Sequence, residues 1–252
     1  MTKRALPPVV ARMWGRETAS RHGPRPSLDL SRIVDAAIGI ADNEGLEGVR
    51  MSSVAAQVGV ATMSLYRYVG SKDELLTVMA DAAAPEPPAI DGRPWRDYLT
   101  EWTRANRDFL LDRPWLLQIP RNTPPVGPRA LRWLDRALAA LAGTGLEVAE
   151  RINIASALTG YANTQAALVH GMTVGAEAGG DGTIGGLADY GDILGQVLDP
   201  ADHPELAAAV HARAFGAAEE WIDDADFAFG LNLLLDGVQA LIARHGGGAA
   251  AG

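Results

Sequence analysis

Apolar residues recur every three to four positions through most of the chain, whereas the alternation typical of half-buried strands is nearly absent. Prolines within residues 85–88 and 124–125 interrupt this pattern. The pattern predicts an all-α protein with a small helical unit over residues 27–82 and a larger one over residues 93–245. The first apolar stripe of the small unit comprises Leu30, Ile33, Val34, Ala37 and Ala41.

Capping residues indicate where the helices of the small unit begin and end. Asp29 is the expected N-cap of its first helix, and Gly45 and Gly48 are expected to end that helix. The sequence Ser71-Lys72-Asp73-Glu74 is a capping box that opens a fourth helix. These signals leave room for two short helices between the first and the fourth.

The two short helices are predicted at about Ser52–Val58 and Ala61–Val69, with Gly59 in the turn between them. Two short helices that cross over a glycine turn are typical of a helix-turn-helix, whose second helix enters the major groove of DNA. Hydroxylated and cationic side chains on that second helix can donate to phosphates and base edges. They are Thr62, Ser64, Tyr66 and Arg67.

The net charge of −9 is unusual for a protein that binds nucleic acid, but the charge is unevenly distributed. Residues 1–26 contain six lysines and arginines and one acidic residue, whereas the rest of the chain is acidic. A basic, flexible arm on an acidic body fits a protein that presents one end to a polyanion. The alternative is a solvated tail without a partner.

Composition excludes several other classes of protein. The chain has no cysteine, and its five histidines lack metal-ligand spacing, so we expect neither a metal nor a cofactor. No uninterrupted apolar stretch reaches 18 residues and no secretory signal is present, which makes a cytoplasmic protein without a membrane segment the default expectation. A glycine-rich stretch runs from Gly175 to Gly186, and we expect a mobile loop at Gly179-Gly180-Asp181-Gly182-Thr183 within it. We also expect a disordered Gly/Ala tail over residues 246–252.

The segment from Ile33 to Met79 resembles the DNA-binding domain of the tetracycline-repressor (TetR) family. The residues that carry the resemblance include Val58-Gly59-Val60, Leu65-Tyr66-Arg67-Tyr68-Val69 and Lys72-Asp73-Glu74-Leu75. Three later stretches are similar to the ligand-binding and dimerisation domain of that family: Arg113-Pro114-Trp115, Gly127-Pro128-x-Ala130-Leu131 and the segment from Phe227 to Gly237. The resemblance implies a homodimeric transcriptional regulator, usually a repressor, which binds a near-palindromic double-stranded operator and is released by a small-molecule effector.

The resemblance also implies roles for individual residues. Ser52 and Ser53 open the second helix, at positions that touch the DNA backbone or a base in the family. Thr62 and Ser64 are candidates for base edges or phosphates, and the Tyr66 hydroxyl and Lys72 are candidates for phosphates. Met51 and Met63 stand where polar residues or proline are frequent in the family, so no base preference can be inherited.

Polar side chains interrupt the apolar pattern of two predicted helices in the larger unit, at residues 94–112 and 147–172. Ligand sites are apolar cavities with a few convergent polar groups, and the resemblance places the effector pocket among these helices. The candidate pocket residues are Trp102, Asn106, Phe109, Trp115, Leu134, Tyr161, Gln165 and His170. The alternative for Asn106 is a hydrogen bond to a neighbouring backbone carbonyl.

The last predicted helix, over about residues 225–244, has an apolar face wider than one core requires. Two glycines seven residues apart would allow a second helix to approach closely. This face predicts a four-helix bundle between two subunits, formed with helix 147–172 of each. The candidate dimerisation residues are Phe227, Gly230, Leu231, Leu234, Gly237, Val238 and Leu241.

Two other functions are compatible with an all-α chain. One is a small-molecule-binding scaffold whose N-terminal unit binds protein rather than DNA, and the other is a helical enzyme. The sequence contains no Gly-x-Ser-x-Gly elbow, P-loop lysine or His-Glu-x-x-His motif, and Gly179-Gly180-Asp181-Gly182 lacks the strand that precedes a phosphate loop. We therefore expect a regulator rather than an enzyme.

Overall fold

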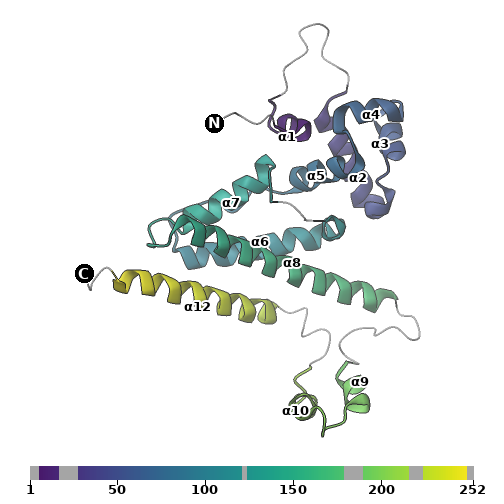
Figure 1. Cartoon of the computed structure of the whole chain (residues 1–252). Coiled ribbons are helices and arrows are strands. Elements are labelled where there is room, and N and C mark those ends of the chain that lie inside the picture. Colours follow the sequence, from purple (N-terminus) through teal and green to yellow (C-terminus); the bar gives the residue numbers. More distant parts are fainter. Residues whose placement is uncertain (1–5, 17–27, 121–123, 179–189, 216–223, 249–252) are drawn as a thin grey trace. The chain divides into compact units, whose positions relative to one another are not determined.

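The computed structural model describes residues 6–16, 28–120, 124–178, 190–215 and 224–248. Every regular element in these ranges is a helix (Figure 1), which confirms the predicted all-α fold class. The chain forms two compact units. The first contains Met1–Arg93 and Asp112–Ala140, and the second contains Pro94–Leu111 and Leu141–Gly252.

The first unit is built around α2, against which several other helices pack. Its core contains aliphatic side chains that are fully or almost fully buried, among them Ile33, Leu65, Val69, Leu75 and Met79. The helices of this unit are α1 (Pro8–Met13), α2 (Leu30–Gly48), α3 (Met51–Val58), α4 (Thr62–Val69), α5 (Lys72–Ala83), the 3-10 helix η1 (Pro114–Gln118) and α7 (Pro128–Ala140).

The predicted caps lie where the sequence placed them. The Asp29 carboxylate accepts a hydrogen bond from the backbone N–H of Arg32 at 2.8 Å, and the Ser71 hydroxyl accepts one from the N–H of Glu74 at 3.1 Å. Gly45 does not end α2 but interrupts it, with φ at 71°, and the helix ends at Gly48. A glycine adopts this left-handed conformation without the steric penalty of a Cβ.

Residues 112–140 pack with the N-terminal helices, although the sequence pattern grouped them with the larger unit. The indole N–H of Trp115 in η1 donates to the Asp42 carboxylate of α2 at 2.8 Å. In α7, the indole N–H of Trp133 donates to the carbonyl of Pro85 at 2.8 Å. These bonds join residues far apart in sequence, so helical periodicity gives no sign of them.

The second unit contains three long helices and a pair of short ones in its described residues. The helices are α6 (Trp95–Asp112), α8 (Val148–Ala178), α9 (Tyr190–Val197), α10 (Pro204–His211) and α12 (Asp224–Gly248). Helix α12 packs on α8 and α9 packs on α10. Fully or nearly buried side chains include Tyr98, Leu99, Trp102, Leu158, Leu231 and Leu235.

The predictions for the two ends of the chain were wrong for the residues that the structure describes. Helix α1 lies within the predicted flexible arm, and α12 includes Gly246–Gly248 of the predicted tail. Helix α8 runs beyond its predicted end at residue 172, through Gly175 to Ala178. A glycine costs only about 1 kcal/mol in a helix interior, so neighbouring helix formers can carry a helix through it. The predicted loop at residues 179–183 lies outside the described residues, as do residues 17–26 of the arm and 249–252 of the tail.

Candidate functional site

Helices α3 and α4 form the predicted helix-turn-helix. Gly59 ends α3 in the left-handed conformation, with φ at 76°. Its N–H donates to the carbonyl of Ala56 at 3.2 Å, and the N–H of Val60 donates to that of Ala55 at 3.0 Å. These two bonds satisfy carbonyls at the helix end and turn the chain sharply into α4.

Helix α4 has one buried side and one exposed side. Leu65 and Val69 have no exposed surface and fasten the helix to the core of the first unit. On the other side, Met63 is 76% exposed and Tyr66 is 41% exposed, and Arg67 is exposed as well. The helix therefore presents a thioether, a phenol and a guanidinium together to its surroundings.

The other predicted DNA-binding residues surround this exposed side. Ser52 is exposed in α3, Thr62 and Ser64 are half-buried in α4, and Lys72 is exposed as the first residue of α5. Lys72 thus belongs to the first turn of a helix, an end that itself attracts anions. Met63, which the sequence analysis had noted only as a departure from the family, is the most exposed apolar residue of α4.

Ser53 differs from the other predicted contacts because its hydroxyl is used within the protein. It accepts a hydrogen bond from the N–H of Arg50 at 3.0 Å, and its oxygen lies 2.7 Å from the carbonyl of Gly48, to which it can donate. The side chain thus stabilises the start of α3. Only its position, at the front of the helix-turn-helix, agrees with the DNA-contacting role that the resemblance implied.

The predicted ligand-binding residues are divided between the two units. Trp115 and Leu134 belong to the first unit, where Trp115 is buried and bonded to Asp42. In the second unit, buried Trp102 and half-buried Asn106 and Phe109 form one stripe along α6. Half-buried Gln165 and His170 lie on α8.

The polar members of this set have free hydrogen-bonding capacity. The amides of Asn106 and Gln165 and the imidazole of His170 make no side-chain hydrogen bond to any residue in the described ranges. The expected alternative for Asn106, a bond to a neighbouring carbonyl, is therefore not found. Half-buried polar groups of this kind can bind a ligand or water.

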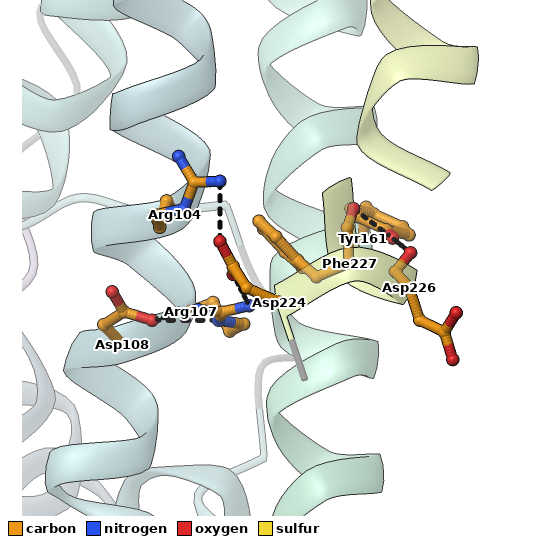
Figure 2. A network of polar contacts seen from close by, with 7 residues as sticks. All are labelled: Arg104, Arg107, Asp108, Tyr161, Asp224, Asp226 and Phe227. Atoms are coloured by element: carbon orange, nitrogen blue, oxygen red, sulfur yellow. Dashed lines mark hydrogen bonds and ion pairs between the residues drawn. The ribbon is translucent and has the colours of Figure 1, made fainter. Parts of the chain in front are cut away.

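Tyr161 has a different environment from the rest of the set (Figure 2). Its hydroxyl donates to the backbone carbonyl of Phe227 in α12 at 2.9 Å, and the two rings stack with centroids 5.3 Å apart. Burial raises the pKa of the Tyr161 phenol, which keeps the donor proton in place. Tyr161 therefore joins α8 to α12.

The predicted dimerisation residues fall on two sides of α12. Phe227, Leu231 and Val238 are buried within the chain, on the stripe that also contains Leu235. The ring of Tyr161 occupies the space beside Gly230, since a Cβ there would lie 2.3 Å from its hydroxyl. Leu234 and Gly237 are exposed, and Leu241 is half-buried.

Apolar side chains that the sequence analysis missed cover the exposed side of α12. Phe229 is 69% exposed and Leu233 is 59% exposed. The stretch Asp224–Gly246 is long and apolar enough to cross a membrane by length and composition alone. However, Asp236 lies in the middle of this helix, where a charged group in a bilayer costs about 2.5–3.5 kcal/mol.

Two family models match this chain. The model described as "Bacterial regulatory proteins, tetR family" matches residues 33–79, and "Tetracyclin repressor-like, C-terminal domain" matches residues 86–242. Helix α1 precedes both matches. The HTH-type transcriptional repressor DrrR1 of Streptomyces coeruleorubidus is 34% identical over 244 residues, which cover 93% of this chain and 86% of DrrR1. The class A tetracycline repressor of Escherichia coli is 27% identical, over 86% of this chain and 94% of that protein.

Solved structures agree with these matches. The crystal structure of ActR from Streptomyces coelicolor in complex with actinorhodin is 26% identical, with a TM-score of 0.69, and the similarity covers 87% of this chain and 99% of ActR. Matches of this extent and the α3–α4 geometry lead to one conclusion. The chain belongs to the TetR family and is a helix-turn-helix, DNA-binding transcriptional regulator.

Proposed function

We propose that this chain is a homodimeric repressor that binds a near-palindromic operator through α3 and α4 and leaves it when a small molecule binds the helices of the C-terminal domain. The observation that carries the DNA-binding part is the two-sided α4, which is buried at Leu65 and Val69 and exposed at Tyr66 and Arg67. Ser52, Thr62, Ser64 and Lys72 complete the proposed contact surface.

Salt dependence of operator binding tests this surface. The affinity for the upstream region of the chain's own gene is measured by fluorescence anisotropy at several salt concentrations. Each lost phosphate contact lowers the slope of log affinity against log salt by about 0.9. We expect this loss for Lys72→Met, and none for Arg244→Met, which removes a positive charge from exposed α12. Equal slopes for both variants would show that Lys72 does not contact phosphate.

The two sides of α12 support the proposed dimer. Phe229, Leu233 and Leu234 are exposed on one side, while the stripe through Leu231 is buried against the same chain. Apolar α8 residues are exposed too, at Ile152, Leu168 and Val174. Two copies that pair through α8 and α12 would cover both sets of side chains in a four-helix bundle.

A matched pair of substitutions tests the bundle. Leu233→Asp and Leu234→Asp should give folded monomers that no longer bind the operator, because both add charge to the exposed side. Leu231→Asp should instead unfold the second unit, because Leu231 is 1% exposed. Sedimentation velocity and circular dichroism distinguish these results. A Leu233→Asp protein that remains a dimer would show that this side is not the interface.

The effector part of the proposal is supported by the relatives and by the free polar groups. ActR was solved in complex with actinorhodin. In this chain, Trp102 and Phe109 flank Asn106 on α6, and the Asn106 amide makes no hydrogen bond within the described ranges. An aromatic stripe with one amide suits a largely aromatic effector that accepts or donates a hydrogen bond.

A further inference from the structure

Three arginines on one side of α6 reach across to α12. Arg96 lies 2.7 Å from the Asp236 carboxylate, and Arg104 and Arg107 each lie 2.8 Å from that of Asp224. Positions 96, 104 and 107 share one face of a helix, since they are eight and three residues apart. We call Arg96, Arg104 and Arg107 the arginine row.

Arg107 makes the largest number of different contacts in this row (Figure 2). Its guanidinium pairs with Asp224 and Asp108 and lies 4.1 Å from the centre of the Phe227 ring. Phe227 in turn stacks on Tyr161 of α8. The Arg107 side chain is 14% exposed, so these contacts are partly shielded from solvent. One residue of α6 thus connects α12 and, through Phe227, α8.

Apolar packing alone does not determine where α12 lies along its neighbours. Its buried stripe is aliphatic except for Phe227, and the buried residues of α8 include the small Ala155, Ala162 and Ala166. Apolar attraction has no preferred direction, so small and aliphatic side chains specify the register of a helix less tightly than polar pairs do. Hydrogen bonds between an arginine and a carboxylate tolerate only a narrow range of distances and angles. A few polar pairs can therefore select one register, as they do in coiled coils.

The row holds α12 at two points along its length. Asp224 is the first residue of the helix and Asp236 lies twelve residues later. Arg96 also lies 3.2 Å from the amide oxygen of Asn232. Since both points are anchored to the same rigid helix, α12 can neither slide nor rotate without breaking several charge-assisted bonds.

We propose that the arginine row of α6, in which Arg107 makes the most contacts, is the positioning device that fixes the register of α12 and so aligns its exposed apolar side for pairing with a second copy of the chain. The inference rests on the proposed dimer. Arg107 is a positioning residue in this role, because it acts through α12 and not by contact with the partner.

The test compares Arg107→Met, Arg107→Lys and the control Arg244→Met in the full-length chain. Arg107→Met should raise the dimer dissociation constant about tenfold, the equivalent of one lost charge-assisted hydrogen bond. Arg107→Lys keeps the charge but loses the planar fork, so it should restore part of the affinity. The control removes an exposed charge from α12, near its C-terminal end, and should leave the constant unchanged.

A distance measurement separates register from simple stability. The chain has no cysteine, so a spin label at Gln239→Cys on α12 would be the only label in each subunit. Double electron–electron resonance should give a narrow distribution of distances between the two labels in the otherwise wild-type dimer. Arg107→Met should shift or broaden that distribution. An unchanged distribution would overturn the inference, whether or not the dimer is weaker. A wild-type chain that stays monomeric would instead refute the proposed dimer.

Discussion

The carboxylate of Asp81, near the end of α5, accepts a hydrogen bond from the backbone N–H of Ala130 in the first turn of α7 at 2.9 Å. The N–H of Arg129 lies 3.3 Å from the other carboxylate oxygen. The residue before α7 is Gly127, where a Cβ would lie 2.2 Å from this carboxylate. Helix α7 thus takes its N-terminal cap from the helix that follows the recognition helix.

Asp81→Ala should destabilise the protein by about 1–2 kcal/mol, because it removes both a helix cap and a negative charge at a helix N-terminus. Urea unfolding followed by circular dichroism measures the change. Asp135→Ala, at an exposed position of α7, is the control and should change the stability by less than about 0.5 kcal/mol. Equal losses for the two variants would contradict the capping role.

Gly230 and Gly237 should respond differently to alanine. At Gly230 the new Cβ meets the Tyr161 ring, which should lose its bond to Phe227 at a cost of about 1–3 kcal/mol. At Gly237 nothing lies within 4 Å, so Gly237→Ala should stabilise the isolated chain by up to about 1 kcal/mol. If a partner helix approaches closely at Gly237, the same substitution weakens the dimer. Thermal unfolding measures the stability of each chain, and sedimentation equilibrium measures the affinity of the dimer. A Gly237→Ala chain that is less stable than wild type would contradict the predicted stabilisation at this position.

Asn106→Leu should leave operator binding intact and weaken the response to effector. With an aromatic compound that releases the wild-type chain from its operator, we expect a roughly tenfold higher concentration for half-release of Asn106→Leu, equivalent to one hydrogen bond. Asn153→Leu, at an exposed position of α8, is the control. Unchanged release of Asn106→Leu by the same compound would place the effector elsewhere and leave Asn106 without a ligand-binding role.

The ion pairs of Asp224 make the stability of the second unit depend on acid. Burial opposes ionisation of this carboxylate, but the hydrogen bonds from Arg107 and Arg104 outweigh it and hold its pKa below the usual value for an aspartate. A lowered folded-state pKa stabilises the protein above the unfolded-state pKa, and that stabilisation is lost as the pH falls through the folded value. Between about pH 5 and pH 3, wild type should therefore lose stability faster than Asp224→Asn. Parallel pH profiles of the two proteins would contradict this.

The helix-turn-helix could be predicted closely because its signals are local. Gly59 ends α3 because it adopts the left-handed conformation, and Ser71 begins α5 because its hydroxyl caps that helix. The spacing of Val54, Leu65 and Val69 identifies the buried side. The exposed face of α4 follows from the same register. Ser53 shows the limit of such reasoning, since its type and position suggested DNA contact while its hydroxyl caps α3.

The contacts between distant helices could not be predicted from the pattern. Tyr161 lies among apolar neighbours on α8, and Gly230 lies among apolar neighbours on α12. Only the packing of α8 against α12 shows that the Tyr161 ring fills the space beside Gly230. The wide apolar face of α12 was recognised correctly, but the pattern does not say which part covers the chain's own core. Phe229 and Leu233 were assigned to neither part for this reason.

Helix α1 anchors the start of the chain to the first unit. The Trp14 indole donates to the carbonyl of Val126 at 2.8 Å, and Arg12 lies 3.8 Å from Glu74. The first described helix is thus held both by α5, the helix that follows the recognition helix, and by the segment that leads into α7.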